Sequence, residues 1–148
     1  MSMETSVESR INEESLDLIR CKMNDTPELG LDGEEVEVSV EEYRRFLVLK
    51  MENPGAKLAP TSLMDKAWHM HILDTRRYAE DCDAMFGRFL HHHPSYKGVE
   101  SEERGDVLIR ASEMMATLYS ERFGHDPLDA GSGCNTDDDG SACTGVSC

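Results

Sequence analysis

Residues 62–93 read SLMDKAWHMHILDTRRYAEDCDAMFGRFLHHH, and this stretch decides the fold. It holds the only tryptophan of the chain and five of its six histidines. Apolar residues recur in it at helical spacing, and Ser62 with Asp65 three residues later is a helix-start pattern. Pro94 forbids much further helix. We therefore predict one long central helix over about 62–90.

The two histidines that follow the tryptophan face different sides of this helix, because an α-helix advances about 100° per residue. His71 falls on the apolar side and His69 points outward. A buried imidazole needs hydrogen-bond partners, and Thr75, one turn from His71, can supply one. The motif and polar-core residues predicted on the inner side or at its border are Trp68, Asp74, Thr75, Tyr78, Asp81 and Cys82.

Imidazoles are frequent ligands of zinc and other transition metals when several of them converge. The candidate metal ligands in this stretch are His69, His71, His91 and His92. The strong zinc signatures His-Glu-x-x-His and Cys-x-x-Cys are absent, and His71 and Cys82 would lie about 16 Å apart on a straight helix. On these residues alone, a structural polar core is favoured over a metal site, and a solvated helix end remains open for residues 91–93.

The rest of the chain predicts three more helices. The first covers residues 7–23 and the last covers residues 101–123. The one between them starts at a capping box formed by Ser39 and Glu42 and ends at about residue 53. Valines alternate with other residues over 36–40, so a short strand there is an alternative interpretation. The buried stripe expected for the last helix is Val107, Leu108, Ala111, Met115, Leu118 and Phe123. We thus predict an all-α bundle of about four main helices in residues 1–127. The Cys/Asp-rich tail 128–148 lacks bulky apolar residues and is predicted to be disordered.

Composition narrows the function. A chain of 148 residues suits one domain, and 39% hydrophobic with 30% charged residues is typical of a globular protein. The formal net charge of −15 disfavours nucleic acid and anionic membranes as partners, and leaves a protein partner open. The first residues show no secretory signal. Five cysteines, an odd number, fit a reducing cytoplasmic compartment.

The central stretch also resembles the glycine-rich domain-containing protein-like family, in its short, bacterial-type form. The resemblance covers residues 40–125 and implies an all-helical domain without a defined activity. It rests on Trp-His-x-His, a following tyrosine, Asp-Cys and a glycine, together with a later histidine pair. In this chain these residues are Trp68, His69, His71, Tyr78, Asp81, Cys82, Gly87, His91 and His92.

Three functions follow as hypotheses. The first is a histidine-centred site for zinc or another transition metal, with one of residues 91–93 joining His71, and His69 or an acidic residue completing the set. The second is a non-enzymatic interaction domain in which the same side chains form a structural polar core. The third is a metal-dependent enzyme. Cys134, Cys143 and Cys148 of the tail could also hold cations loosely.

Overall fold

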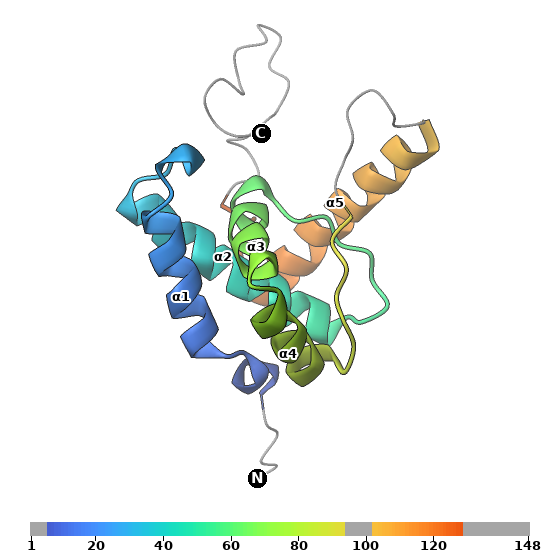
Figure 1. The fold of residues 1–148 in the computed structure, drawn as a ribbon. Coiled ribbons are helices and arrows are strands. Elements are labelled where there is room, and N and C mark those ends of the chain that lie inside the picture. Colours follow the sequence, from blue (N-terminus) through green and yellow to red (C-terminus); the bar gives the residue numbers. More distant parts are fainter. Residues whose placement is uncertain (1–5, 94–101, 129–148) are drawn as a thin grey trace, which may run out of the picture.

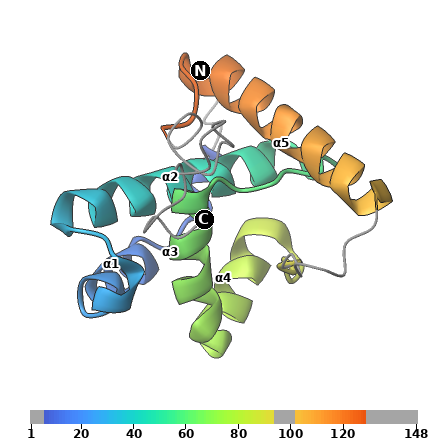
Figure 2. The same ribbon diagram turned by 90° about the horizontal axis from the view of Figure 1, so that it is seen from above.

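The computed structural model describes residues 6–93 and 102–128, with side chains from residue 105 onward in the second range. These residues are helical without any strand, which confirms the all-α prediction. Helix α2 lies at the centre, with α1 and α3 on one side and α5 on the other (Figures 1 and 2). The helices are α1 (Glu13–Asn24), α2 (Gly33–Glu52), α3 (Ser62–Leu73), α4 (Thr75–Phe86) and α5 (Glu102–Phe123).

The helix predicted over residues 7–23 is interrupted. A short 3-10 helix, Val7–Arg10, comes first, and α1 starts only after Asn12. The side chain of Asn12 accepts hydrogen bonds from the backbone N–H groups of Glu14 and Ser15, so it caps a new helix rather than continuing an old one.

Helix α2 begins six residues before the predicted cap. Asp32 and Glu35 form the capping box, each accepting from the backbone N–H of the other. The alternative of a strand over 36–40 is wrong, and so is the cap at Ser39. The hydroxyl of Ser39 is buried inside α2 and donates to the backbone carbonyl of Leu63 at the start of α3.

The long helix predicted over 62–90 is divided at Asp74. Its backbone is non-helical (φ −88°, ψ 77°), and its side chain accepts from the backbone N–H of Arg77 to start α4. Helix α4 ends at Phe86 because Gly87 adopts a left-handed conformation (φ 69°). In a straight helix His71 and Asp81 would be about 15 Å apart, whereas the bend brings these two side chains together.

Helix α5 has its predicted bounds, and Gly124 follows it with φ 85°. Its predicted buried stripe is correct only in the C-terminal half, where Met115 is buried. Val107 and Leu108 are exposed, because the N-terminal half of α5 extends beyond the other helices (Figure 1). Tyr119 is fully buried, although it lay outside the predicted stripe.

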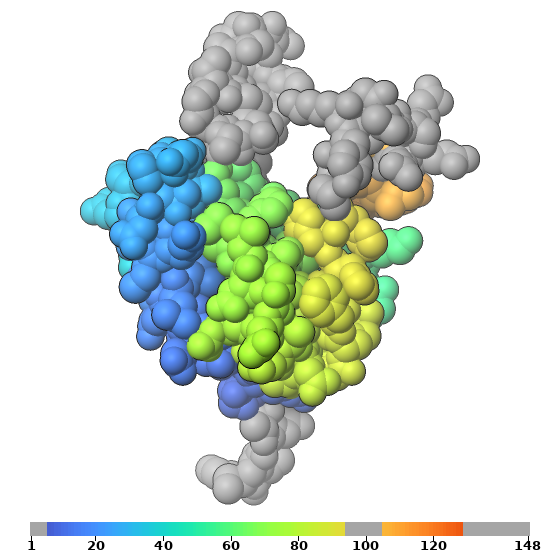
Figure 3. Space-filling model, viewed as in Figure 1, coloured from blue at the N-terminus to red at the C-terminus, as the bar shows by residue number. Residues whose placement is uncertain are grey.

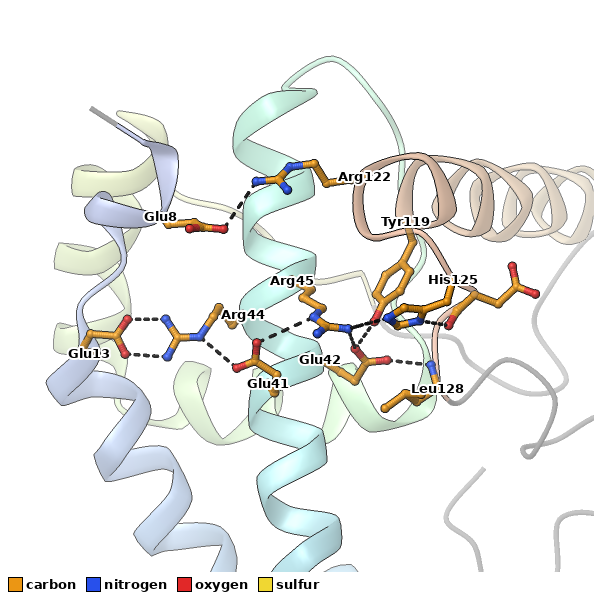
Figure 4. Close-up of polar contacts among 11 residues, drawn as sticks. Glu8, Glu13, Glu41, Glu42, Arg44, Arg45, Tyr119, Arg122, His125 and Leu128 are labelled. Carbon is orange, nitrogen blue, oxygen red and sulfur yellow. Dashed lines mark hydrogen bonds and ion pairs between the residues drawn. The ribbon is translucent and has the colours of Figure 1, made fainter. Parts of the chain in front are cut away.

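Glu42, predicted as a cap residue, instead anchors the end of α5 (Figure 4). Its buried carboxylate accepts from the hydroxyl of Tyr119 at 2.5 Å and from the backbone N–H of Leu128 at 2.8 Å. Arg45 donates to the same hydroxyl at 2.6 Å. Burial raises the pKa of Tyr119 to about 12, so this hydroxyl remains a hydrogen-bond donor at neutral pH.

Across residues 6–93 and 102–128, no helix is both long and apolar enough to cross a membrane. The predicted disordered tail and its three cysteines lie outside the described residues, apart from Leu128.

Candidate metal centre

His71 is the centre of a closed polar core. Its side chain is 2% exposed, as its position on the predicted helix wheel indicated. The hydroxyl of Tyr43 lies 2.7 Å from Nδ1, and a carboxylate oxygen of Asp81 lies 2.7 Å from Nε2. Burial lowers the pKa of His71, against the opposing effect of Asp81. A neutral ring that donates from Nε2 to Asp81 and accepts at Nδ1 from Tyr43 satisfies every group.

The carboxylate of Asp81 is satisfied by residues of α1 and its cap. It accepts from the hydroxyl of Ser15 at 2.6 Å and from the amide of Asn12 at 3.3 Å. Arg77 donates in turn to Ser15 at 3.2 Å. Among the described residues, no buried side-chain nitrogen or oxygen lacks a hydrogen-bond partner. This core therefore has no polar atom left over for a ligand.

A second hydrogen-bond chain fixes the segment that follows α4. The indole N–H of Trp68 donates to the hydroxyl oxygen of Tyr78 at 2.8 Å, and that hydroxyl donates to the backbone carbonyl of Leu90 at 2.5 Å. Cys82 is fully buried beside them, and burial raises the pKa of its thiol. A raised thiol pKa disfavours the thiolate that a nucleophile requires, so Cys82 is a core residue.

Asp65, His69 and His92 form a separate group of ligand-type side chains. Asp65 and His69 lie one turn apart on α3. His92 lies in the segment after α4 that the hydrogen bond from Tyr78 to Leu90 holds in place. Nε2 of His92 is 2.7 Å from one carboxylate oxygen of Asp65, and Nδ1 of His69 is 3.2 Å from the other. One ligand atom from each residue lies within 4.8 Å of the other two.

The group lies at the surface, and its three side chains differ in how far they are exposed to solvent. The side chain of His92 is only 14% exposed, and its ring centroid lies 4.5 Å from that of Trp68. The side chains of Asp65 and His69 are 35% and 49% exposed. The rings of His69 and His92 lie 4.6 Å apart. Solvent can therefore reach the group from the side of His69.

This donor set suits a divalent transition metal. Two imidazole nitrogens and one carboxylate oxygen are ligands for zinc in catalytic sites and for non-haem iron. Metal–ligand bonds of about 2.0–2.1 Å in a tetrahedral site place neighbouring ligand atoms roughly 3.3 Å apart. The ligand atoms here lie within 4.8 Å of one another, so the side chains that are farther apart would have to move closer to bind one ion. Three protein ligands would leave a position for water or another molecule.

The structure brings together two of the four predicted metal ligands, His69 and His92. His71 lies apart from them, with both nitrogens hydrogen-bonded. His91 is exposed and packs against the ring of Phe89 at 4.8 Å. Asp65 was missed as a ligand, although its spacing of four residues from His69 on one helix was a usable signal.

The predicted polar core is present with different pairings. Trp68, Tyr78 and Cys82 are buried as expected, and Asp81, predicted at the border, is buried too. Thr75 is exposed, so the expectation that it pairs with His71 is wrong. The reason is the helix break, because the residue after Asp74 starts α4 instead of completing a turn of α3. Tyr43, which replaces Thr75 as the partner, comes from α2.

A family model described as UCP032817-like matches residues 17–117, more than half of the chain. The matched range includes all three residues of the candidate metal group. This finding overturns the resemblance to the glycine-rich domain-containing protein-like family, because the matching model describes a different family. No curated protein and no solved structure matches the chain.

Proposed function

The chain belongs to the UCP032817-like family, and we propose that its helical domain binds a divalent transition metal ion through Asp65, His69 and His92. The observation that carries the proposal is the convergence of three ligand atoms from two separate segments within 4.8 Å. Zinc is the first candidate, since two imidazoles and a carboxylate suit it and its tetrahedral site tolerates one open position.

Neighbouring contacts support a site prepared in advance of the metal. The carboxylate of Asp65 already lies between the two imidazoles, with a hydrogen bond to His92 and a contact of 3.2 Å to Nδ1 of His69, before an ion arrives. Trp68 packs against His92, and its own N–H is tied to Tyr78. Ligands that are oriented by surrounding groups bind metal more tightly than unsupported ones.

The proposal is tested by metal content. Untagged full-length chain with Cys134→Ser, Cys143→Ser and Cys148→Ser is loaded with zinc, desalted and measured by mass spectrometry of the metal. The substitutions remove thiolates that could bind zinc elsewhere. We expect close to one equivalent of zinc per chain. Substoichiometric metal under these conditions would overturn the proposal.

Matched variants in the same background locate the ion. His69→Ala removes a half-exposed ligand and should weaken zinc binding by at least about tenfold. His91→Ala removes an exposed imidazole outside the group and should leave zinc binding unchanged. Equal losses in the two variants would show that zinc binds to surface histidines without a defined site.

A second function, a non-enzymatic protein-interaction scaffold, is favoured by the closed polar core around His71. The buried hydrogen bonds among Tyr43, His71 and Asp81 suit a role in packing the helices. This function predicts the same thermal stability with and without a chelator. Unfolding by chelator alone would reject it. A metal-dependent enzyme is the third function, and the open coordination position is the feature that would serve it.

A further inference from the structure

A cavity lies on another part of the molecule, between α1 and the junction of α3 and α4. Its volume is about 360 Å³, which falls in the range of small-molecule sites. Figure 3 shows this side, with α1 in blue beside α3 and α4 in green. The cavity shares no residue with the metal group. Its apolar lining residues are Leu18, Ile19, Met70 and Leu73.

Two of these apolar residues are incompletely covered by the rest of the protein. Leu18 is 44% exposed and Leu73 is 69% exposed, although both are large hydrophobic residues. Leu73 is held in this position because α3 ends there, immediately before the break at Asp74. A ligand with an aliphatic portion would remove this apolar surface from water, which is favourable in proportion to the area covered.

Of the two cationic residues that line the cavity, one is paired with carboxylates and the other is not. Arg77 is 3.5 Å from a carboxylate oxygen of Asp74 and 4.0 Å from one of Glu14. Lys22 also lines the cavity and forms no ion pair with any residue in the described ranges. Asp74 and Glu14 thus both pair with Arg77, and Lys22 is left as the cation at the cavity without a carboxylate partner, in a chain whose net charge is −15. A ligand carboxylate would find an unpaired ammonium group here.

The buried polar groups that line the cavity cannot serve as the main ligand contacts. His71 uses both ring nitrogens within the protein core. The hydroxyl of Ser15 already donates to Asp81 and accepts from Arg77. Recognition of a polar ligand group therefore falls to the two cations at the cavity.

We propose that this cavity binds a short-chain aliphatic monocarboxylate. The alkyl chain packs against Leu18, Ile19, Met70 and Leu73, and the carboxylate pairs with Lys22 and Arg77. The repulsion from acidic residues elsewhere is screened at physiological ionic strength, where the Debye length is about 8 Å.

The test is an NMR titration of isotope-labelled full-length chain with hexanoate, with chelator present so that the result is independent of the metal site. We expect saturable shifts at the methyl groups of Leu18, Ile19, Met70 and Leu73, with roughly millimolar affinity. Each methylene added between butanoate and hexanoate should strengthen binding by roughly fourfold. Hexanol and hexylamine should bind more weakly than hexanoate.

Matched lysine variants separate charge recognition from apolar binding. Lys22→Gln should weaken hexanoate binding by roughly fivefold and leave hexanol binding unchanged. Lys57→Gln, an exposed lysine that does not line the cavity, should have no effect. No saturation by about 20 mM hexanoate, equal affinity for hexanol, or equal effects of the two lysine variants would overturn the proposal.

Discussion

Replacement of His71 by alanine is the sharpest test of the polar core. The substitution removes an imidazole that is 2% exposed and that joins α3 to both α2 and α4. It leaves the hydroxyl of Tyr43 without the acceptor it has in the native protein. It also removes the donor that lies 2.7 Å from the carboxylate of Asp81. Three helices therefore lose a shared contact through one change.

The expected cost follows from these contacts. A buried polar group left without a partner costs about 1–3 kcal/mol, and this applies fully to the hydroxyl of Tyr43. Asp81 keeps its hydrogen bonds from Ser15 and Asn12, so its loss is smaller. The space left by the ring adds a cavity cost. We expect the free energy of unfolding to fall by about 3–5 kcal/mol, and the Tm to fall by roughly 10 °C or more.

Urea unfolding followed by circular dichroism at 222 nm measures this change, with chelator present in all samples. His69→Ala is the control, because its half-exposed ring makes only a surface contact with Asp65, whose loss should cost less than about 1 kcal/mol. A cost below about 1 kcal/mol for His71→Ala, or equal destabilisation of the two variants, would contradict a structural role for His71.

Three further predictions concern groups outside this contact. The pKa of Tyr119, about 12 in the folded protein, exceeds the value of about 10 for unfolded chains, so the stability it adds is complete below pH 10 and lost between pH 10 and 12. Urea midpoints of the native chain should therefore fall more steeply over that interval than those of Tyr119→Phe, and parallel curves would contradict this. Cys21 is exposed and Cys82 is buried with a raised pKa, so peptide mapping after brief alkylation should find Cys21 modified and Cys82 unmodified until the protein unfolds. Gly87→Ala should lower the free energy of unfolding measured in urea by about 1 kcal/mol, because φ at this position is 69°. Gly55→Ala is the control and should have no such effect, because its φ is not left-handed. Equal effects of the two variants would count against a backbone cause.

Much of the fold could be predicted from local patterns in the sequence. The bounds of α5 follow from its apolar spacing and from Gly124. The break at Asp74 could not be recognised by periodicity, because apolar residues continue at helical spacing on both sides of it. Asp74 is a common helix-capping residue type, but an aspartate on the surface of a continuous helix has the same local sequence. Only the packing of α4 against the rest of the bundle decides between the two.

Only part of the candidate metal group could be predicted from the sequence, because the rest depends on contacts between distant segments. The outward direction of His69 and the burial of His71 follow from the helical repeat. The partnership of His92 with Asp65 depends on the turn at Gly87 and on the hydrogen bond of Tyr78 to Leu90. These are contacts between distant parts of the chain, which spacing within one helix does not reveal.

The ligands of the proposed metal ion can be identified by X-ray absorption spectroscopy of the untagged full-length chain loaded with one equivalent of zinc. Binding by Asp65, His69 and His92 predicts imidazole and oxygen scatterers at about 2.0–2.1 Å and a loss of imidazole signal in His92→Ala. A spectrum dominated by sulfur at about 2.3 Å would assign the zinc to the cysteines. A spectrum unchanged in His92→Ala would place the zinc on other residues and contradict the site at α3.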